Sequence, residues 1–292
     1  MTAARPRGDG PARRPGSPAG GRPPRRVRKP LPPRTGVQPP RAIVRRSSEA
    51  WALQSALERH GLGPVVGVDE AGRGACAGPL AVAACILRPG DAKHFDGLTD
   101  SKLLSAAERD RLAKIVRRRA LDQCVVLVDP EEVDRRGVHA ANIDGMRRAV
   151  ARLGLRPGYV LTDGFPVSGF GVPSLAVPKG DLAAACVAAA SILAKTTRDA
   201  LMAELHERRP EYGFAVHKGY CTPTHTAALA HHGPSPDHRY SFVNVAGAAR
   251  LVGDRTAHFR GGSVVTDDPG SVGHNDEVVD SDEPDAEGGE GP

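Results

Sequence analysis

Residues 64–87 read PVVGVDEAGRGACAGPLAVAACIL, and this stretch decides the fold of the chain. The apolar run 64–68 predicts a short buried strand that ends at Asp69-Glu70. A second apolar run, 80–87, predicts another strand, and the glycine-rich segment 72–74 between them is a turn signal. The stretch therefore predicts a β-hairpin that carries two acidic residues next to its turn.

The apolar patterns that follow this hairpin predict alternating helices and strands. Strands are expected at 124–128, 159–162 and 174–177, and helices at 139–153 and from 182 to about 207. Ser105 and Glu108 form a capping-box pattern, which predicts a further helix that continues to about Arg118. This order predicts the α/β class: a mixed β-sheet flanked by helices, with a small C-terminal helical part.

The two ends of the chain differ in composition from its middle. Residues 1–46 carry thirteen Lys and Arg against one acid, whereas residues 261–292 carry ten acids and no Lys or Arg. Such segments cannot bury enough apolar surface to offset the entropy lost on ordering. We therefore expect a disordered Arg/Pro-rich tail at 1–48, one folded domain at 49–252 and a disordered acidic tail at 253–292.

The five cysteines are scattered, and no two of them form a C-x-x-C pair. Neither a disulfide framework nor a zinc site is therefore expected, which fits a reducing cytoplasm. No run of about 18 apolar residues is present, so no membrane span is expected. The start of the chain lacks the apolar segment of a secretory signal. These features predict a cytoplasmic protein.

Four carboxylates fall at or next to the ends of predicted strands: Asp69, Glu70, Asp163 and Asp181. Strand ends lie on the rim of a sheet, where ligands commonly bind. Hard cations such as Mg²⁺ prefer oxygen ligands, and a two-metal phosphodiesterase needs several carboxylates that converge. A single acid at a strand end is usually only solvated, and sequence spacing alone does not establish convergence.

Five sequence blocks, taken together and in this order, resemble the ribonuclease HII family. They are GVDEAGRG at 67–74, DSKL at 100–103, DG at 163–164, KGD at 179–181 followed by AASILAK at 189–195 and RD at 198–199, and HKGY at 217–220 with Thr222 and His225. Ala75 and Cys76 depart from the family pattern, in which Pro and a larger apolar residue are more common. The departure removes no functional group.

The resemblance implies a ribonuclease H-like fold and an endonuclease that produces 5′-phosphate and 3′-hydroxyl ends. Its expected substrates are the RNA strand of RNA–DNA hybrids and single ribonucleotides embedded in duplex DNA, which it would cut on their 5′ side. The implied role is the removal of misincorporated ribonucleotides, and the implied cofactor is Mn²⁺ or Mg²⁺. We expect a monomer that binds nucleic acid and no membrane.

The resemblance also assigns roles to the carboxylates. Asp69 would bridge two metal ions, Glu70 and Asp163 would hold one of them, and Asp181 would hold the other. The substrate-binding residues that it implies are Gly72, Arg73, Gly74, Lys102, Ser191, Lys195 and Tyr220.

Each of these substrate-binding residues has an expected task. The backbone of the loop 72–74 would recognise the ribose 2′-hydroxyl. Tyr220 would stack on the sugar or base beyond the junction. Lys102 and Lys195 are expected near phosphates or the acidic cluster, while Ser191 and Lys195, four apart on a helix, could instead only tie that helix to the site.

Other interpretations stay open at this point. A ribonuclease HIII-type enzyme would share the fold, but the Pro/Arg tail counts against the folded N-terminal domain expected of that type. A non-catalytic nucleic-acid-binding protein has no need of four carboxylates that would repel phosphates. A dinucleotide-binding protein lacks its G-x-G-x-x-G motif. The basic tail could grip phosphates or only be solvated.

Some residues are given a purely structural interpretation. We expect His231, His232 and His238 to be surface histidines, because no Cys or acid at suitable spacing supports a zinc site. Met202 and Leu205 are expected in the core.

Overall fold

A computed structural model describes residues 50–252 of the chain, with side chains up to residue 250. The tails expected to be disordered, 1–48 and 253–292, lie outside these residues. Among the helices that the structure describes, none is long and apolar enough to cross a membrane.

The sheet that carries the site has five strands in the order β3-β2-β1-β4-β5. They are β1 (Val65–Ala71), β2 (Leu80–Ile86), β3 (Asp122–Val128), β4 (Tyr159–Asp163) and β5 (Ser174–Val177). β2 pairs antiparallel with both β1 and β3, whereas β4 pairs parallel with both β1 and β5. The predicted hairpin and the mixed sheet are confirmed.

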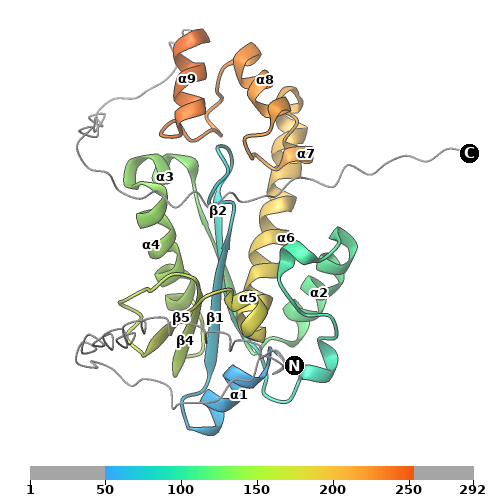
Figure 1. Cartoon of the computed structure of the whole chain (residues 1–292), viewed down its shortest axis with the longest axis vertical. Coiled ribbons are helices and arrows are strands. Elements are labelled where there is room, and N and C mark those ends of the chain that lie inside the picture. The colour runs from blue at the N-terminus through green and yellow to red at the C-terminus, as the bar shows by residue number, and fades with distance from the viewer. Residues whose placement is uncertain (1–49, 253–292) are drawn as a thin grey trace, which may run out of the picture. The chain divides into compact units, whose positions relative to one another are not determined.

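Helices cover both faces of this sheet. The described helices are α1 (Ala52–Arg59), α2 (Ala106–Arg119), α3 (Pro130–Arg136), α4 (Val138–Ala151), α5 (Gly180–Ala183), α6 (Ala185–Arg208), α7 (Phe214–His217), α8 (Pro223–His232) and α9 (Val243–Val252), with 3-10 turns η1 (Ala92–His94), η2 (Ser101–Leu103) and η3 (Pro210–Tyr212). α6 and α2 lie on one side of β1 and β2, and α3 and α4 lie on the other (Figure 1). Because both faces are covered, every residue of β2 is buried.

The predicted helix from 182 to about 207 is wrong as a single element. Ala184 has extended backbone angles, φ −142° and ψ 120°, and separates α5 from α6. The first turn of α6 is capped from outside, because Ala185 N donates to Ala50 O (2.8 Å) and Cys186 N donates to Gln54 Oε1 (2.9 Å). The break leaves Asp181 on its own short helix beside the ends of β4 and β5.

Two other predicted helices hold. The Ser105–Glu108 capping box begins α2 as expected. The helix expected at 139–153 is α4, but it is preceded by α3, which sequence periodicity did not indicate. α3 begins with Pro130 at its first turn, a position where the missing N–H of proline costs nothing.

His238 is not a surface histidine, although His231 and His232 are exposed as expected. The Ser235 N–H donates to His238 Nδ1 (3.0 Å), and the His238 and His225 Nε2 atoms lie 3.1 Å apart. His225 Nδ1 in turn contacts Tyr220 O (2.9 Å). The chain of bonds is satisfied when both rings are neutral: His238 Nε2–H donates to His225 Nε2, and His225 Nδ1–H donates to the Tyr220 carbonyl.

These buried rings join the C-terminal helical part to its neighbours. Met202 and Leu205 of α6, confirmed as core residues, pack in the same cluster as Tyr212 and Phe214. His238 packs edge-on against Tyr212, with ring centroids 4.8 Å apart. Figure 1 shows α8 and α9 beyond the end of the sheet at which β1 turns into β2.

The closest approach of a helix to the sheet requires a glycine. A Cβ on Gly67 of β1 would lie 2.1 Å from the backbone carbon of Cys186 in α6. Gly67→Ala should therefore lower the free energy of unfolding by about 1–3 kcal/mol, because α6 must move away from the sheet. The measurement is urea unfolding followed by circular dichroism. Gly247→Ala is the control, because a Cβ at Gly247 in α9 meets open space and should leave stability unchanged or raise it slightly.

The buried histidines predict a pH dependence of stability. Burial lowers the pKa of His225 to about 4 and that of His238 to about 3. In the unfolded chain both have pKa values near 6.5, so between about pH 6.5 and 4 the unfolded state binds more protons. The contribution of these rings is therefore fully present above about pH 6.5 and is lost as the pH falls.

Comparison of His238→Asn with His231→Asn isolates this effect from other titrating groups. The slope of unfolding free energy against pH below about 6.5 should be shallower in His238→Asn than in the parent chain, by up to about 1.4 kcal/mol per pH unit. His231→Asn changes an exposed ring and should keep the parent slope. Identical slopes in all three proteins would contradict the neutral buried assignment.

Candidate active site

Three of the four predicted carboxylates converge. Each of Asp69, Asp163 and Asp181 places an oxygen within 4.8 Å of the others. The parallel pairing of β1 with β4 sets Val68 opposite Thr162, so the next residues along, Asp69 and Asp163, lie at the same level of the sheet. The third comes from α5, directly after β5, where Gly180 N donates to Asp163 Oδ1 (2.6 Å).

Glu70 lies beside this group and on the opposite face of the sheet. Successive side chains of a strand point to opposite faces. Accordingly, Asp69 interacts with Ser191 of α6, and Glu70 with Asn142 of α4. Glu70 Oε2 and both polar atoms of the Asn142 side chain are buried without a hydrogen-bond partner. The Glu70 carboxylate and the Asn142 amide are therefore neighbours that do not form a hydrogen bond with each other.

Burial and mutual repulsion raise the pKa values of all four carboxyl groups. Burial raises that of Asp69 well above its usual range, and Glu70 and Asp163 raise it further. Burial raises the pKa of Glu70 to about 7 and, with the repulsion of Asp163, that of Asp181 to about 7. The pKa of Asp163 is also raised, chiefly by burial. Clustered carboxylate oxygens that repel one another fit a hard divalent cation.

Asp100 is an acidic neighbour that the sequence did not single out. It raises the pKa of both Asp163 and Asp181 by repulsion. Its Oδ1 accepts a hydrogen bond from Lys102 N (2.9 Å), which caps η2. The signal that could have identified Asp100 is its position at the start of the DSKL block, one of the five blocks that resemble a known family.

Lys102 lies on this same turn with an exposed side chain. Its charge lowers the pKa values of both Glu70 and Asp163, so its ammonium group acts on the carboxylate group. Ser191 is tied to the turn as well, through Ser101 Oγ at 2.9 Å, and it lowers the pKa of Asp69. Both side chains therefore act on the carboxylate group, and their roles towards a substrate stay predictions.

Lys195 points to Tyr220. Its Nζ forms an ion pair with Asp199 (3.3 Å) and lies 6.0 Å from the centre of the Tyr220 ring. The ring is half-buried, which leaves part of it available to a ligand. Lys195 therefore lies next to Tyr220, which is itself a predicted substrate-binding residue.

The glycine-rich loop rests on a buried arginine, Arg198 of α6. Gly72 has φ +85°, and a Cβ there would lie 1.8 Å from Arg198 Nε. The guanidinium group donates to the carbonyls of Ala77 (3.0 Å), Pro79 (3.0 Å) and Lys218 (2.8 Å). Gly72 is therefore required both for its backbone conformation and for the space below it.

The same arginine connects this loop to Tyr220, because its Cζ lies 5.5 Å from the Tyr220 ring centre. A second buried arginine, Arg239, donates to Gly78 O (3.0 Å) and to Arg73 O (3.1 Å). Burial lowers the pKa of Arg239 to about 9, and the repulsion of Arg198 adds to this. Sequence reasoning missed both roles. Arg198 lies in a family-like block, but Arg239 carried no signal.

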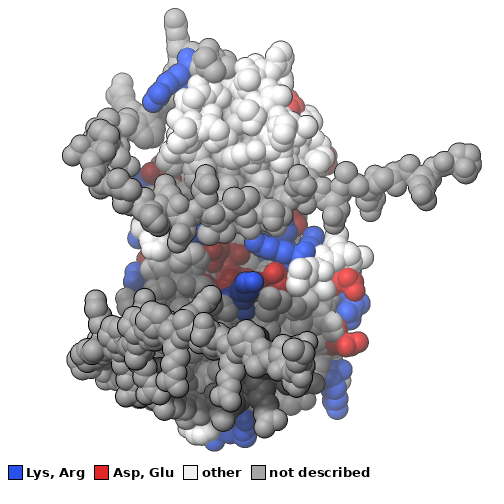
Figure 2. All heavy atoms as spheres, in the orientation of Figure 1, with Lys and Arg blue, Asp and Glu red and all other residues white. Residues whose placement is uncertain are grey.

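The other residues of the loop face outward. A Cβ on Gly74 would meet nothing within 4 Å, so the backbone there is open to a ligand. The Arg73 guanidinium lies 4.8 Å from the centre of the Phe165 ring and lowers the pKa of Glu70. Figure 2 shows acidic atoms gathered near the middle of one face, where β1 runs in Figure 1, with basic atoms directly beside them.

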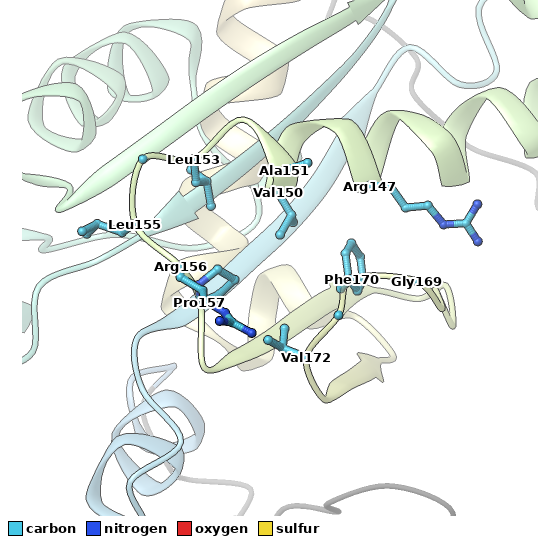
Figure 3. Close-up of a pocket in the computed structure, with 12 residues that line it drawn as sticks. Arg147, Val150, Ala151, Leu153, Leu155, Arg156, Pro157, Gly169, Phe170 and Val172 are labelled. Carbon is cyan, nitrogen blue, oxygen red and sulfur yellow. The ribbon is translucent and has the colours of Figure 1, made fainter.

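A separate pocket of about 330 Å³ lies at the C-terminal end of α4. Its walls come from that helix and from the loops at 153–157 and 169–172, with Phe170 and Arg147 on one side (Figure 3). None of the four carboxylates lines it. The candidate active site is therefore the carboxylate group and not this pocket.

Comparison with known proteins reveals extensive similarity. A family model described as Ribonuclease HII matches residues 66–245. A Ribonuclease HII of Saccharopolyspora erythraea is 63% identical over 204 residues, which cover 70% of this chain and 90% of that protein. A Ribonuclease HII of Mycolicibacterium smegmatis is 62% identical over 218 residues, which cover 75% of this chain and 80% of that protein.

Solved structures share the fold. The ribonuclease H2 from Pyrococcus horikoshii OT3 matches with a TM-score of 0.58 and 25% identity, covering 65% of this chain and 99% of that one. The structure of the PCNA:RNase HII complex from Archaeoglobus fulgidus contains a chain that matches with a TM-score of 0.53 and 28% identity, covering 61% of this chain and 94% of that one.

Burial of the carboxylate group and the repulsion within it predict that its members destabilise the metal-free protein. A raised carboxyl pKa contributes stability below the unfolded-state value near 4 and loses it as the pH rises through the folded value, about 7 for Asp181. Asp181→Asn should therefore raise the midpoint of thermal unfolding above pH 7 in excess chelator, by about 2–4 °C for each kcal/mol of relief. Asp110→Asn, on the exposed face of α2, is the control and should leave the midpoint unchanged.

Proposed function

Because this chain belongs to the ribonuclease HII family, and is accordingly an endonuclease of the ribonuclease H type, we propose that it cuts on the 5′ side of single ribonucleotides in duplex DNA as well as within RNA–DNA hybrids. The observation that carries the proposal is the convergence of Asp69, Asp163 and Asp181 beside Glu70. We assign this activity to one domain, residues 49–252, and to the removal of misincorporated ribonucleotides.

The proposal includes two divalent ions, Mg²⁺ or Mn²⁺, because the donor set consists of carboxylate oxygens. Asp69 would be shared by both ions, Glu70 and Asp163 would hold one, and Asp181 would hold the other. When bound, such ions supply an activated water and stabilise the leaving oxygen of a phosphodiester. Although Glu70 and Asp69 point to opposite faces of β1, the repulsion between Glu70 and Asp163 supports the assignment of Glu70 as a ligand, because it indicates that these two carboxylates lie near each other at the end of the strand.

The chain's own residues would orient the substrate. The open backbone at Gly74 can approach the 2′-hydroxyl, because no side chain intervenes. Tyr220 would stack on the neighbouring nucleotide, held in place by Arg198 beneath its ring. Lys102 and Arg73 would attract phosphates towards a site that is otherwise acidic.

We further propose that the enzyme acts as a monomer in the cytoplasm. All four carboxylates and Tyr220 come from one chain, so no second copy is needed to complete the site. A ribonuclease HIII-type enzyme is the alternative within the same fold. The rate of cleavage at a single embedded ribonucleotide, relative to the rate on a long RNA–DNA hybrid, distinguishes the two types.

The direct test is cleavage of a duplex that contains one ribonucleotide, compared with an all-DNA duplex of the same sequence. The parent protein should cut only the first, on the 5′ side of the ribonucleotide, and excess EDTA should abolish cutting. Asp69→Asn should reduce cleavage by several orders of magnitude while the protein stays folded, because it removes the shared ligand. Full activity of Asp69→Asn, or cleavage that persists in EDTA, would contradict the mechanism.

Tyr220 allows a test of junction recognition. Tyr220→Phe should keep most activity, and Tyr220→Ala should lose much of it, because base stacking contributes about 1–3 kcal/mol. The loss should be larger on a single embedded ribonucleotide than on a long hybrid, where many registers are available. Initial rates on both substrates measure this. Equal losses would exclude a junction-sensing role, and a Phe variant as poor as the Ala variant would exclude stacking.

A further inference from the structure

Two cysteines that are far apart in the sequence lie together behind the substrate-recognition elements. The Cys76 N–H donates to Gly219 O (3.0 Å), and the Cys76 thiol donates to the same carbonyl (3.5 Å). Cys221 follows two residues later, and its Sγ accepts a hydrogen bond from Asn244 Nδ2 (3.2 Å). Because Gly219 lies two residues before Cys221, these bonds hold the Cys76 side chain against the segment that carries Cys221, and the Asn244 amide acts on both thiols.

The environments of the two thiols are opposite. Cys221 is exposed, and Cys76 is buried. The neighbouring Cys76 thiol and the Asn244 amide lower the pKa of Cys221 to about 7, since both stabilise its thiolate. The pKa of Cys76 is raised, chiefly by the neighbouring Cys221 side chain and by burial. An exposed thiolate with a second thiol beside it is the arrangement found in cysteines that oxidise reversibly.

We propose that Cys221 is a site of oxidation by hydroperoxides and that Cys76 is its resolving thiol, so that the pair closes a disulfide between the glycine-rich loop and the Tyr220 segment. The arrangement of the two thiols is the observation that supports this modification site. Its effect on activity rests on the proposed function, in which these two segments recognise the ribonucleotide.

The chemistry proceeds in two steps. The Cys221 thiolate attacks one peroxide oxygen, so that an S–O bond forms, the O–O bond breaks, and the released oxide takes a proton to leave as water or an alcohol. The Cys76 sulfur then attacks the Cys221 sulfur, the S–S bond forms, and the leaving hydroxide takes the Cys76 proton to give water. Two thiols lose two electrons in total, and the peroxide gains them. Loss of the Cys221 thiolate also removes the largest cause of the raised Cys76 pKa.

A disulfide would alter both recognition elements. Cys76 lies two residues after Gly74, and Cys221 directly follows Tyr220. A covalent bond of about 2.05 Å with a fixed dihedral preference would replace the separate hydrogen bonds that now hold the two sulfurs. Because the Cys76 backbone and Arg198 already join these segments, the shift should be transmitted to the Gly74 backbone and the Tyr220 ring.

The experiment uses the full-length protein, treated with hydrogen peroxide and then with catalase. Peptide mapping under non-reducing conditions should find one intramolecular disulfide, between Cys76 and Cys221. Cleavage of the single-ribonucleotide duplex should fall several-fold and return on reduction with dithiothreitol. Cys221→Ser, which changes an exposed side chain, should keep the activity of the reduced parent and resist peroxide. Cys124→Ser is the matched control and should behave like the parent.

Three results would overturn the proposal: the absence of a Cys76–Cys221 linkage after oxidation, equal inactivation of Cys221→Ser, or a linkage that forms without any change in cleavage. The first two reject the modification site, and the third rejects its coupling to recognition. Failure of the proposed function is a separate result, because the reduced parent would then not cut the single-ribonucleotide duplex at all.

Discussion

Repulsion among buried carboxylates is the constraint on which the rest of the site depends. Each of Asp69, Asp163 and Asp181 places an oxygen within 4.8 Å of the others, and burial together with the charge of Asp163 raises the pKa values of Asp69 and Asp181. Left free, such groups would separate. They stay together because each is fixed by its own element: a central strand, the parallel strand beside it, and a short helix capped onto the end of that strand. The energy cost of this arrangement is offset when a divalent cation binds.

The frame that holds the carboxylates also positions the glycine-rich loop and Tyr220, the proposed recognition elements. α6 approaches β1 at Gly67 without an intervening side chain, and it supplies Ser191 to the acidic group at one level and Arg198 to the glycine-rich loop at another. One helix therefore sets the distance between the carboxylate group and the glycine-rich loop. A set distance of this kind matters because positioning is a large part of what a phosphodiesterase contributes.

Two buried guanidinium groups, those of Arg198 and Arg239, hold the loops around the site by donating hydrogen bonds to backbone carbonyls. Each carbonyl belongs to a loop that could otherwise adopt several conformations. The planar set of donors on an arginine can bind several such carbonyls in one geometry, which a lysine could not do. The loop conformation is thereby determined by groups distant from it in sequence.

The sequence by itself determined the local structure and the family. Apolar periodicity located the five strands, the Ser105–Glu108 pattern located the start of α2, and five ordered blocks indicated the chemistry, because these signals depend on neighbours within a few residues. Only the tertiary structure decided the break at Ala184, the burial of His238, the support of Gly72 by a distant arginine, and the meeting of two cysteines that no sequence spacing connects. Contacts between residues more than a hundred positions apart leave no periodic trace, since they depend on how elements pack and not on how each one forms.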